Sequence, residues 1–96
     1  MYFAISCIDK PGALDIRMEN RLAHMEYLTA LSAVVKFAGP YLGEDGETMN
    51  GSLIIIEADD RMSVETFLAN DPYAKAKLFE SVEIRAWKWA IGNPDF

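Results

Sequence analysis

Residue types that bind metals or form cross-links are scarce in this chain. Of its 96 residues, one is cysteine and one is histidine. A single cysteine cannot form a disulfide within the chain, and one cysteine with one histidine is too few for an ordinary zinc site. We therefore expect neither a disulfide nor a bound metal.

Positive charge is also in short supply. Acidic residues outnumber basic ones 15 to 9, and the net charge is −6. Such a chain repels phosphate backbones and anionic lipid surfaces. Nucleic acid and membrane are accordingly not expected as partners.

Targeting, membrane-spanning and nucleotide-binding patterns are missing as well. No apolar run approaches the roughly 18 residues of a transmembrane helix, and no basic segment with a cleavable apolar core opens the chain. Gly43, Gly46 and Gly51 have neither the dinucleotide spacing nor a Gly-Lys-Ser/Thr ending. With Cys7 in an apolar stretch, these absences predict a soluble, cytoplasmic protein without a cofactor.

What is present is an ordinary globular composition. Hydrophobic residues make up 51% of the chain and charged residues 25%. A chain of this length is at the low end of the single-domain range and buries a modest core. We expect one domain over residues 1–96, whose stability is shared with a partner.

The order of the expected elements indicates an α+β fold. Residues 2–8, 36–42, 52–58 and 81–91 have the composition of strands, and the apolar spacing over 14–34 is helical. Ser63 could cap a short helix, and Asp71-Pro72 could begin another that reaches about Leu78. The order βαββαβ predicts a ferredoxin-like four-stranded antiparallel sheet with helices on one face.

The other face of that sheet is too apolar to face water. Both sides of residues 2–8 and 52–58 are hydrophobic, and the last strand offers Trp87, Trp89 and Ile91 on one side. An apolar surface of this size on a small protein usually marks an association surface. We predict a homodimer packed sheet to sheet, and we assign the two tryptophans to the interface before any ligand.

Positive residues share the inward stripe of the long helix. At about 100° per residue, Arg17, Arg21 and His24 align with the inward leucines, Leu28 and Leu31. Glu19, Ala23, Glu26 and Ala30 fall on the opposite side, toward solvent. Buried charge is costly unless it is paired, so the stripe requires an anion, either a carboxylate of the protein or a ligand.

Two interpretations of these residues stay open. In one, the arginine side chains extend to the solvent at the rim of the core, and His24 is a buried histidine whose hydrogen bonds are made within the protein. Asp71 is then a helix cap, which its position before proline favours. In the other, His24 is a general acid or base that is oriented by a carboxylate such as Asp71. Cys7 is a poor nucleophile, because burial in an apolar strand raises a thiol pKa.

A set of short motifs connects the chain to a known family. These are Arg17, Arg21-x-x-His24, Ala38-Gly39-Pro40, Gly51-Ser52 and Asp71-Pro72-Tyr73, and with them the chain resembles the YciI or YCII-related family over nearly its whole length. The resemblance implies a dimeric α+β barrel. It also implies an active site containing a histidine and an aspartate, here His24 and Asp71, with Arg17 and Arg21 facing the substrate.

The resemblance suggests a reaction class without fixing it. A few members of the family are dehydrochlorinases of chlorinated or hydroxylated aromatic rings, and related barrels include muconolactone isomerases and small monooxygenases; fold alone cannot choose among these. Our leading hypothesis is a cofactor-independent lyase or isomerase of a small anionic metabolite, with aromatic rings among the candidates. His24→Ala should then abolish turnover, and Arg17→Ala should mainly weaken binding.

Two alternatives remain. The chain could be a non-catalytic metabolite-binding or accessory module. It could also be a plain interaction domain whose inward arginines are all paired with Glu or Asp of its own chain or of its dimer mate.

Overall fold

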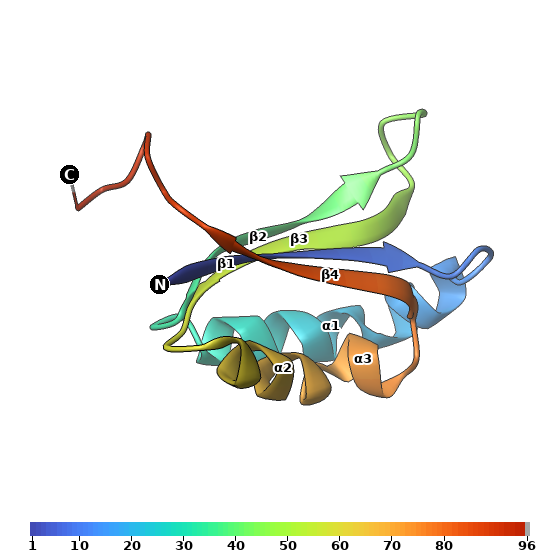
Figure 1. The fold of residues 1–96 in the computed structure, drawn as a ribbon. Coiled ribbons are helices and arrows are strands. Elements are labelled where there is room, and N and C mark those ends of the chain that lie inside the picture. Colours follow the sequence, from blue (N-terminus) through green and yellow to red (C-terminus); the bar gives the residue numbers. More distant parts are fainter. Residues whose placement is uncertain (96) are drawn as a thin grey trace.

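The computed structural model describes residues 1–95. It consists of the elements β1 (Tyr2–Asp9), α1 (Leu14–Ala30), β2 (Val35–Leu42), β3 (Met49–Glu57), α2 (Arg61–Ala69), α3 (Pro72–Lys75) and β4 (Phe79–Trp87). The strands form one antiparallel sheet in the order β2-β3-β1-β4, and the helices lie together on one face of it (Figure 1). The predicted ferredoxin-like α+β fold is confirmed.

The core lies between this sheet and the helices. Odd-numbered residues of β1 and even-numbered residues of β3 face the helices, because Phe3 pairs with Ile56 and Ile5 with Ile54. Fully burying a large aliphatic side chain contributes about 1.5–3 kcal/mol. The buried cluster contains Phe3, Ile5, Cys7, Ile54, Ile56, Val64, Phe67 and Leu68.

Several predicted boundaries were wrong. The long helix ends at Ala30, not Val34, because residues 31–34 form a turn in which the Val34 and Val35 N–H groups both donate to Leu31. The last strand covers Phe79–Trp87 and does not reach Ile91, because Trp87 is already paired with Tyr2 at the start of β1. A strand cannot extend past the end of the neighbour that supplies its hydrogen bonds.

The cap of α2 was also assigned to the wrong residue. Asp60 is the N-cap, and its Oδ1 accepts hydrogen bonds from the Ser63 N–H at 2.8 Å and the Ser63 hydroxyl at 2.9 Å. Ser63 therefore lies in the first turn of the helix. The start of α3 was predicted correctly, because Asp71 caps it and Pro72 is its first residue, although this helix ends at Lys75.

The second face of the sheet, which we call the open face, is not covered by any element of residues 1–95 (Figure 1). An aromatic cluster of Tyr2, Phe37, Trp87 and Trp89 occupies one end of it, with ring centroids 5.2–6.4 Å apart. Phe37 is 42% exposed and Trp87 is 36% exposed. The aromatic end of the open face is thus apolar, as the sequence predicted, whereas further along it β4 places Arg85 opposite Ala4 and Glu83 opposite Ser6.

Among residues 1–95, the helices are too short or too polar to cross a lipid bilayer.

Candidate functional site

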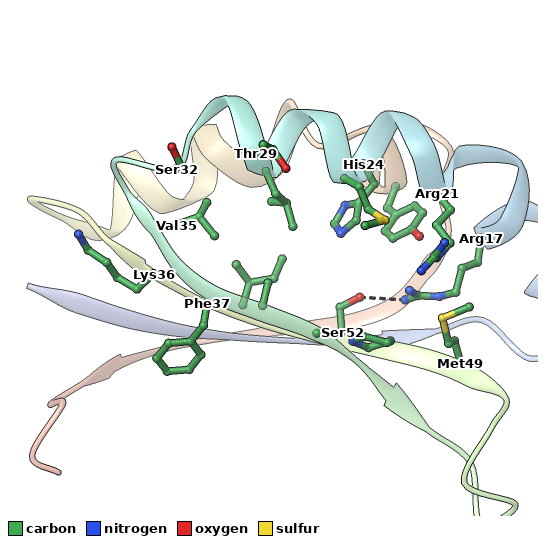
Figure 2. Close-up of a pocket in the computed structure, with 17 residues that line it drawn as sticks. Arg17, Arg21, His24, Thr29, Ser32, Val35, Lys36, Phe37, Met49 and Ser52 are labelled. Atoms are coloured by element: carbon green, nitrogen blue, oxygen red, sulfur yellow. Dashed lines mark hydrogen bonds between the residues drawn. The ribbon is translucent and has the colours of Figure 1, made fainter. Parts of the chain in front are cut away.

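The inward side of α1 carries the positive residues that the sequence placed there. Arg17 and His24 are buried, at 2% and 7% exposure, while Arg21 is exposed to solvent but lines a cavity between α1 and the sheet. Figure 2 shows all three side chains extending from the helix toward the strands. Glu19, Ala23, Glu26 and Ala30 are exposed, as predicted for the outer side.

Arg17 is held by a carboxylate of the protein. Its Nε donates to Asp9 Oδ2 at 2.7 Å, and its Nη2 donates to Asp9 Oδ1 at 3.0 Å and to Ser52 Oγ at 2.9 Å. Burial by itself would lower the pKa of Arg17, but the hydrogen bond and charge of Asp9 outweigh it and raise that pKa. Bidentate pairing of this kind fixes a guanidinium in position. Arg17 is therefore anchored at one end of the cavity.

Gly51, next to Ser52 on β3, has no side chain, and the backbone of β1 and a side chain of β2 lie close to it on either side. A Cβ at Gly51 would lie 2.5 Å from the Cys7 carbonyl oxygen and 2.9 Å from Tyr41 Cδ2. Any larger residue would displace β3 at this point, next to the serine that contacts Arg17. The Gly51-Ser52 motif is thus a packing requirement that places a hydroxyl in the site.

His24 and Asp71 form a buried pair. His24 Nδ1 lies 2.8 Å from Asp71 Oδ1, which also accepts a 2.9 Å hydrogen bond from the Tyr73 backbone N–H. A carboxylate can only accept, so Nδ1 is the donor and carries a proton. The ring nitrogen Nε2 forms no hydrogen bond with any of residues 1–95, and in neutral His24 it holds the lone pair.

Asp71 has two structural functions at once. It is 0% exposed, and a single oxygen serves both as the cap of α3 and as the partner of His24. Its other oxygen, Oδ2, has no hydrogen-bond partner within the described chain. The two interpretations left open for Asp71 are therefore compatible, since the cap also orients the imidazole.

Tyr73 completes the packing around the pair. Its ring stacks on the His24 ring with centroids 3.9 Å apart and an interplanar angle of 16°. The Arg17 Cζ lies 4.6 Å from the centroid of the same ring. Burial raises the pKa of the Tyr73 hydroxyl, although the nearby positive charge of Arg17 opposes that shift. Tyr73 thus contacts both functional groups and restricts how the imidazole can rotate.

The cavity beside these residues has a volume of about 380 Å³. Its walls come from one side of α1, from the edge strand β2 and from β3 (Figure 2). Within the described chain its lining has three basic residues and a histidine but no aspartate or glutamate. Asp9 and Asp71, which pair with Arg17 and His24, are not among the lining residues. The lining residues are Arg17, Arg21, His24, Met25, Leu28, Thr29, Ser32, Val35, Lys36, Phe37, Ala38, Gly39, Pro40, Met49, Ser52, Ile54 and Tyr73.

Arg21 is the cation at the His24 end of the cavity that is available to a ligand. It forms no ion pair or side-chain hydrogen bond with any of residues 1–95. Lys36, at the far end, bonds the Ala33 carbonyl at 3.2 Å and lies 3.5 Å from Glu57 Oε1. Arg21 is thus not paired within residues 1–95, so in the plain interaction domain its carboxylate would have to come from the dimer mate.

The sequence did not identify Asp9, Ser52 or Tyr73 as parts of the site. Ser52 and Tyr73 belong to short motifs that were noticed, but nothing in their spacing shows that they meet Arg17. Cys7 is buried beneath the site, and desolvation followed by the charge of Asp71 raises the pKa of its thiol to about 12. Among residues 1–95 no three His, Cys, Asp or Glu side chains gather to hold a metal ion.

Comparison with known proteins agrees with the motifs. The family model of the YCII-related domain matches residues 1–88. The chain belongs to the YCII-related family. A relative from Haemophilus influenzae, an uncharacterised protein, is 28% identical over 95 residues, covering 92% of this chain and 97% of the relative.

Among solved structures, one similar protein is an enzyme with a named reaction. The chain is 40% identical to the 5-chloro-2-hydroxyhydroquinone dehydrochlorinase TftG of Burkholderia phenoliruptrix AC1100, which was solved in complex with 2,5-dihydroxybenzoquinone. The TM-score is 0.84, and the match covers 92% of this chain and 94% of TftG. An antibiotic biosynthesis monooxygenase of Bacteroides thetaiotaomicron, 16% identical with a TM-score of 0.59 over 95% and 90% of the chains, shares the fold alone.

Proposed function

We propose that this protein is a cofactor-independent lyase of the dehydrochlorinase kind, acting on a small, anionic, hydroxylated aromatic compound. The observation that carries the proposal is the His24–Asp71 pair, at 2.8 Å, beside a cavity lined by cations and by no carboxylate. The 40% identity with the dehydrochlorinase TftG over 92% of the chain supports the reaction class.

His24 is the proton-transfer group in this proposal. With Nδ1 engaged by Asp71, the Nε2 lone pair is available to take a proton from a ring hydroxyl of the substrate. The imidazolium that results is stabilised by the buried carboxylate of Asp71, as in other histidine–carboxylate pairs. Tyr73, stacked on the imidazole, keeps the ring in the orientation that this transfer needs.

The arginines bind and stabilise the anion. Arg21 is free to approach a phenolate or carboxylate oxygen, and Arg17 supports the same end of the cavity from its fixed position. As the proton leaves the hydroxyl, negative charge grows on the substrate oxygens, and donors aimed at that charge lower the barrier.

The proton that His24 has taken is returned to the ring carbon that bears chlorine, which leaves a carbonyl at the first oxygen. Chloride then departs with the electron pair of its bond to carbon while a second ring hydroxyl loses its proton and becomes the second carbonyl of a quinone. Two O–H bonds and one C–Cl bond are broken and one C–H bond is formed, so the overall loss is HCl and no external oxidant is needed.

The test is chloride release from 5-chloro-2-hydroxyhydroquinone. The wild-type protein should release chloride stoichiometrically, and His24→Gln should lower kcat by about 10²- to 10⁴-fold, the usual contribution of a general acid or base. The thermal melting curve of His24→Gln serves as the folding control. Full activity in a folded His24→Gln protein would refute the proton-transfer role, and a bound aromatic ligand recovered unchanged would favour the non-catalytic binding module.

The assembly proposed with this function is a homodimer through the open face. Its support is the exposed aromatic cluster of Tyr2, Phe37, Trp87 and Trp89, which is an unfavourable surface to leave in water. Sedimentation velocity at micromolar concentration should give a dimer, and Trp87→Glu should shift it to monomer. A wild-type monomer under these conditions would contradict the assembly without affecting the proposed chemistry.

We also propose the cytoplasm as the location of the protein. The single cysteine, Cys7, is buried and reduced, which suits a reducing compartment.

A further inference from the structure

The cavity is longer than the part that the proposed chemistry uses. Its lining extends along α1 from Arg17 to Thr29, a rise of about 18 Å at 1.5 Å per residue. Along β2 it extends from Val35 to Pro40, about 16 Å at about 3.3 Å per residue. The two walls give similar lengths, so the cavity is a groove under most of the helix.

One aromatic ring fills a minor part of this groove. Packed rings lie about 4.5–7 Å apart between centroids, so one ring accounts for less than half of the length. The volumes lead to the same conclusion. A cavity of about 150 Å³ holds benzene in another protein, and this one, at about 380 Å³, is more than twice that size. A single hydroxylated ring next to His24 would leave the remainder to water.

Polarity divides the groove into two ends. Arg17, Arg21, His24 and Ser52 gather at one end, and Thr29, Ser32, Val35 and Lys36 lie toward the other (Figure 2). Apart from Lys36, the buried or half-buried lining beyond the charged end is apolar and consists of Leu28, Val35 and Ile54, whereas Thr29 and Ser32 are exposed to solvent. The one cation at the far end, Lys36, is engaged with Glu57 and the Ala33 carbonyl at the rim. The far end therefore offers apolar contacts and no free charge for a second anionic group.

We propose that the substrate is an aromatic anion that carries an apolar substituent, an alkyl or aryl group, opposite its acidic head. This inference rests on the proposed function for the place of the head, beside His24 and Arg21. The substituent lies under the second half of α1, between Leu28, Val35 and Ile54. Burial of each methylene contributes about 0.8 kcal/mol, which is about a fourfold gain in affinity.

The experiment compares benzoate with 4-butylbenzoate by isothermal titration calorimetry. Neither compound carries a leaving group, so binding is measured apart from turnover. For the wild-type protein, the butyl group should lower Kd at least tenfold. Equal affinities for the two compounds, or no binding of either, would overturn the inference.

Val35→Phe is designed to fill the apolar end. It should remove the advantage of the butyl group, so that 4-butylbenzoate binds no more tightly than benzoate. Val34→Phe is the matched control, because Val34 is the adjacent residue, is 36% exposed and does not line the groove. Ala38→Leu, at an exposed edge-strand position that does line it, is a second blocking variant if Val35→Phe unfolds. A butyl advantage that survives in both folded blocking variants would show that the tail binds elsewhere.

The outcomes separate this inference from the proposed function. Chloride release from the single-ring substrate together with no butyl advantage would reject the inference and keep the function. A tenfold butyl advantage together with no chloride release under any condition would keep the groove assignment and reject the lyase.

Discussion

Asp71 offers the sharpest test of the site, because one oxygen atom performs two tasks. Asp71→Asn keeps an oxygen that can accept from both the Tyr73 N–H and His24 Nδ1, and it removes the negative charge. Asp71→Ala removes the acceptor altogether. The two variants therefore separate the helix cap from the charge that faces the imidazole.

The expected magnitudes follow from the contacts. A hydrogen bond to a charged group contributes about 1.5–3 kcal/mol and a neutral one about 0.5–1.5 kcal/mol, so loss of the charge should destabilise the imidazolium by about 1–2 kcal/mol. That difference predicts a decrease in kcat of about 5- to 30-fold for Asp71→Asn. Its free energy of unfolding should change by no more than about 1 kcal/mol, because the cap is kept.

Asp71→Ala should behave differently in both measurements. It leaves two buried donors without a partner, the capped Tyr73 N–H and the His24 Nδ1–H, at a cost of about 1–3 kcal/mol each. The assays are urea unfolding for stability and chloride release for kcat. If folded Asp71→Asn retains the wild-type kcat, Asp71 is a helix cap and nothing more.

Three further predictions follow from the contacts of the site and its surroundings. Arg21→Ala should raise KM about tenfold, as expected for the loss of one partly solvated charge-assisted hydrogen bond. Lys75→Ala is the control, because Lys75 is exposed and lies outside the groove. An unchanged KM of Arg21→Ala in steady-state kinetics would contradict the role of Arg21 in substrate binding. Arg17→Ala should lower the free energy of unfolding by about 3–5 kcal/mol in urea unfolding, because Asp9 would keep a buried, unpaired charge. The sequence led us to expect weaker substrate binding from Arg17→Ala. Because this variant also loses stability, Arg21→Ala is the better test of binding. The pKa of Asp45 is lowered from 3.8 to about 2, chiefly by its hydrogen bonds to Thr48 and Glu47. The stabilisation that ionised Asp45 provides is therefore present above pH 3.8 and is lost as the pH falls toward 2. In Asp45→Asn the melting temperature should depend less on pH across that window.

Much of the fold could be predicted from local pattern. The strands, the long helix and the βαββαβ order follow from the period of the apolar residues, and the aromatic open face follows from strands that are hydrophobic on both sides. The boundaries that were wrong depend on other parts of the chain. The last strand stops where β1 begins. Helix α2 starts at Arg61, directly after its cap Asp60, because the side chain of Asp60, and not that of Ser63, accepts from a free N–H group of the first turn.

The sequence by itself determined that Arg17, Arg21 and His24 lie on the inward side of one helix, because helical periodicity depends on neighbouring residues alone. The tertiary structure decided what they meet. Ser52 lies 35 residues from Arg17, and Asp71 lies 47 residues from His24. Those contacts exist because β3 and the start of α3 pack against the same side of α1, and no local pattern encodes an encounter across that distance. For the same reason, the anion required by Arg17 turned out to be Asp9, which leaves Arg21 as the residue available to a ligand.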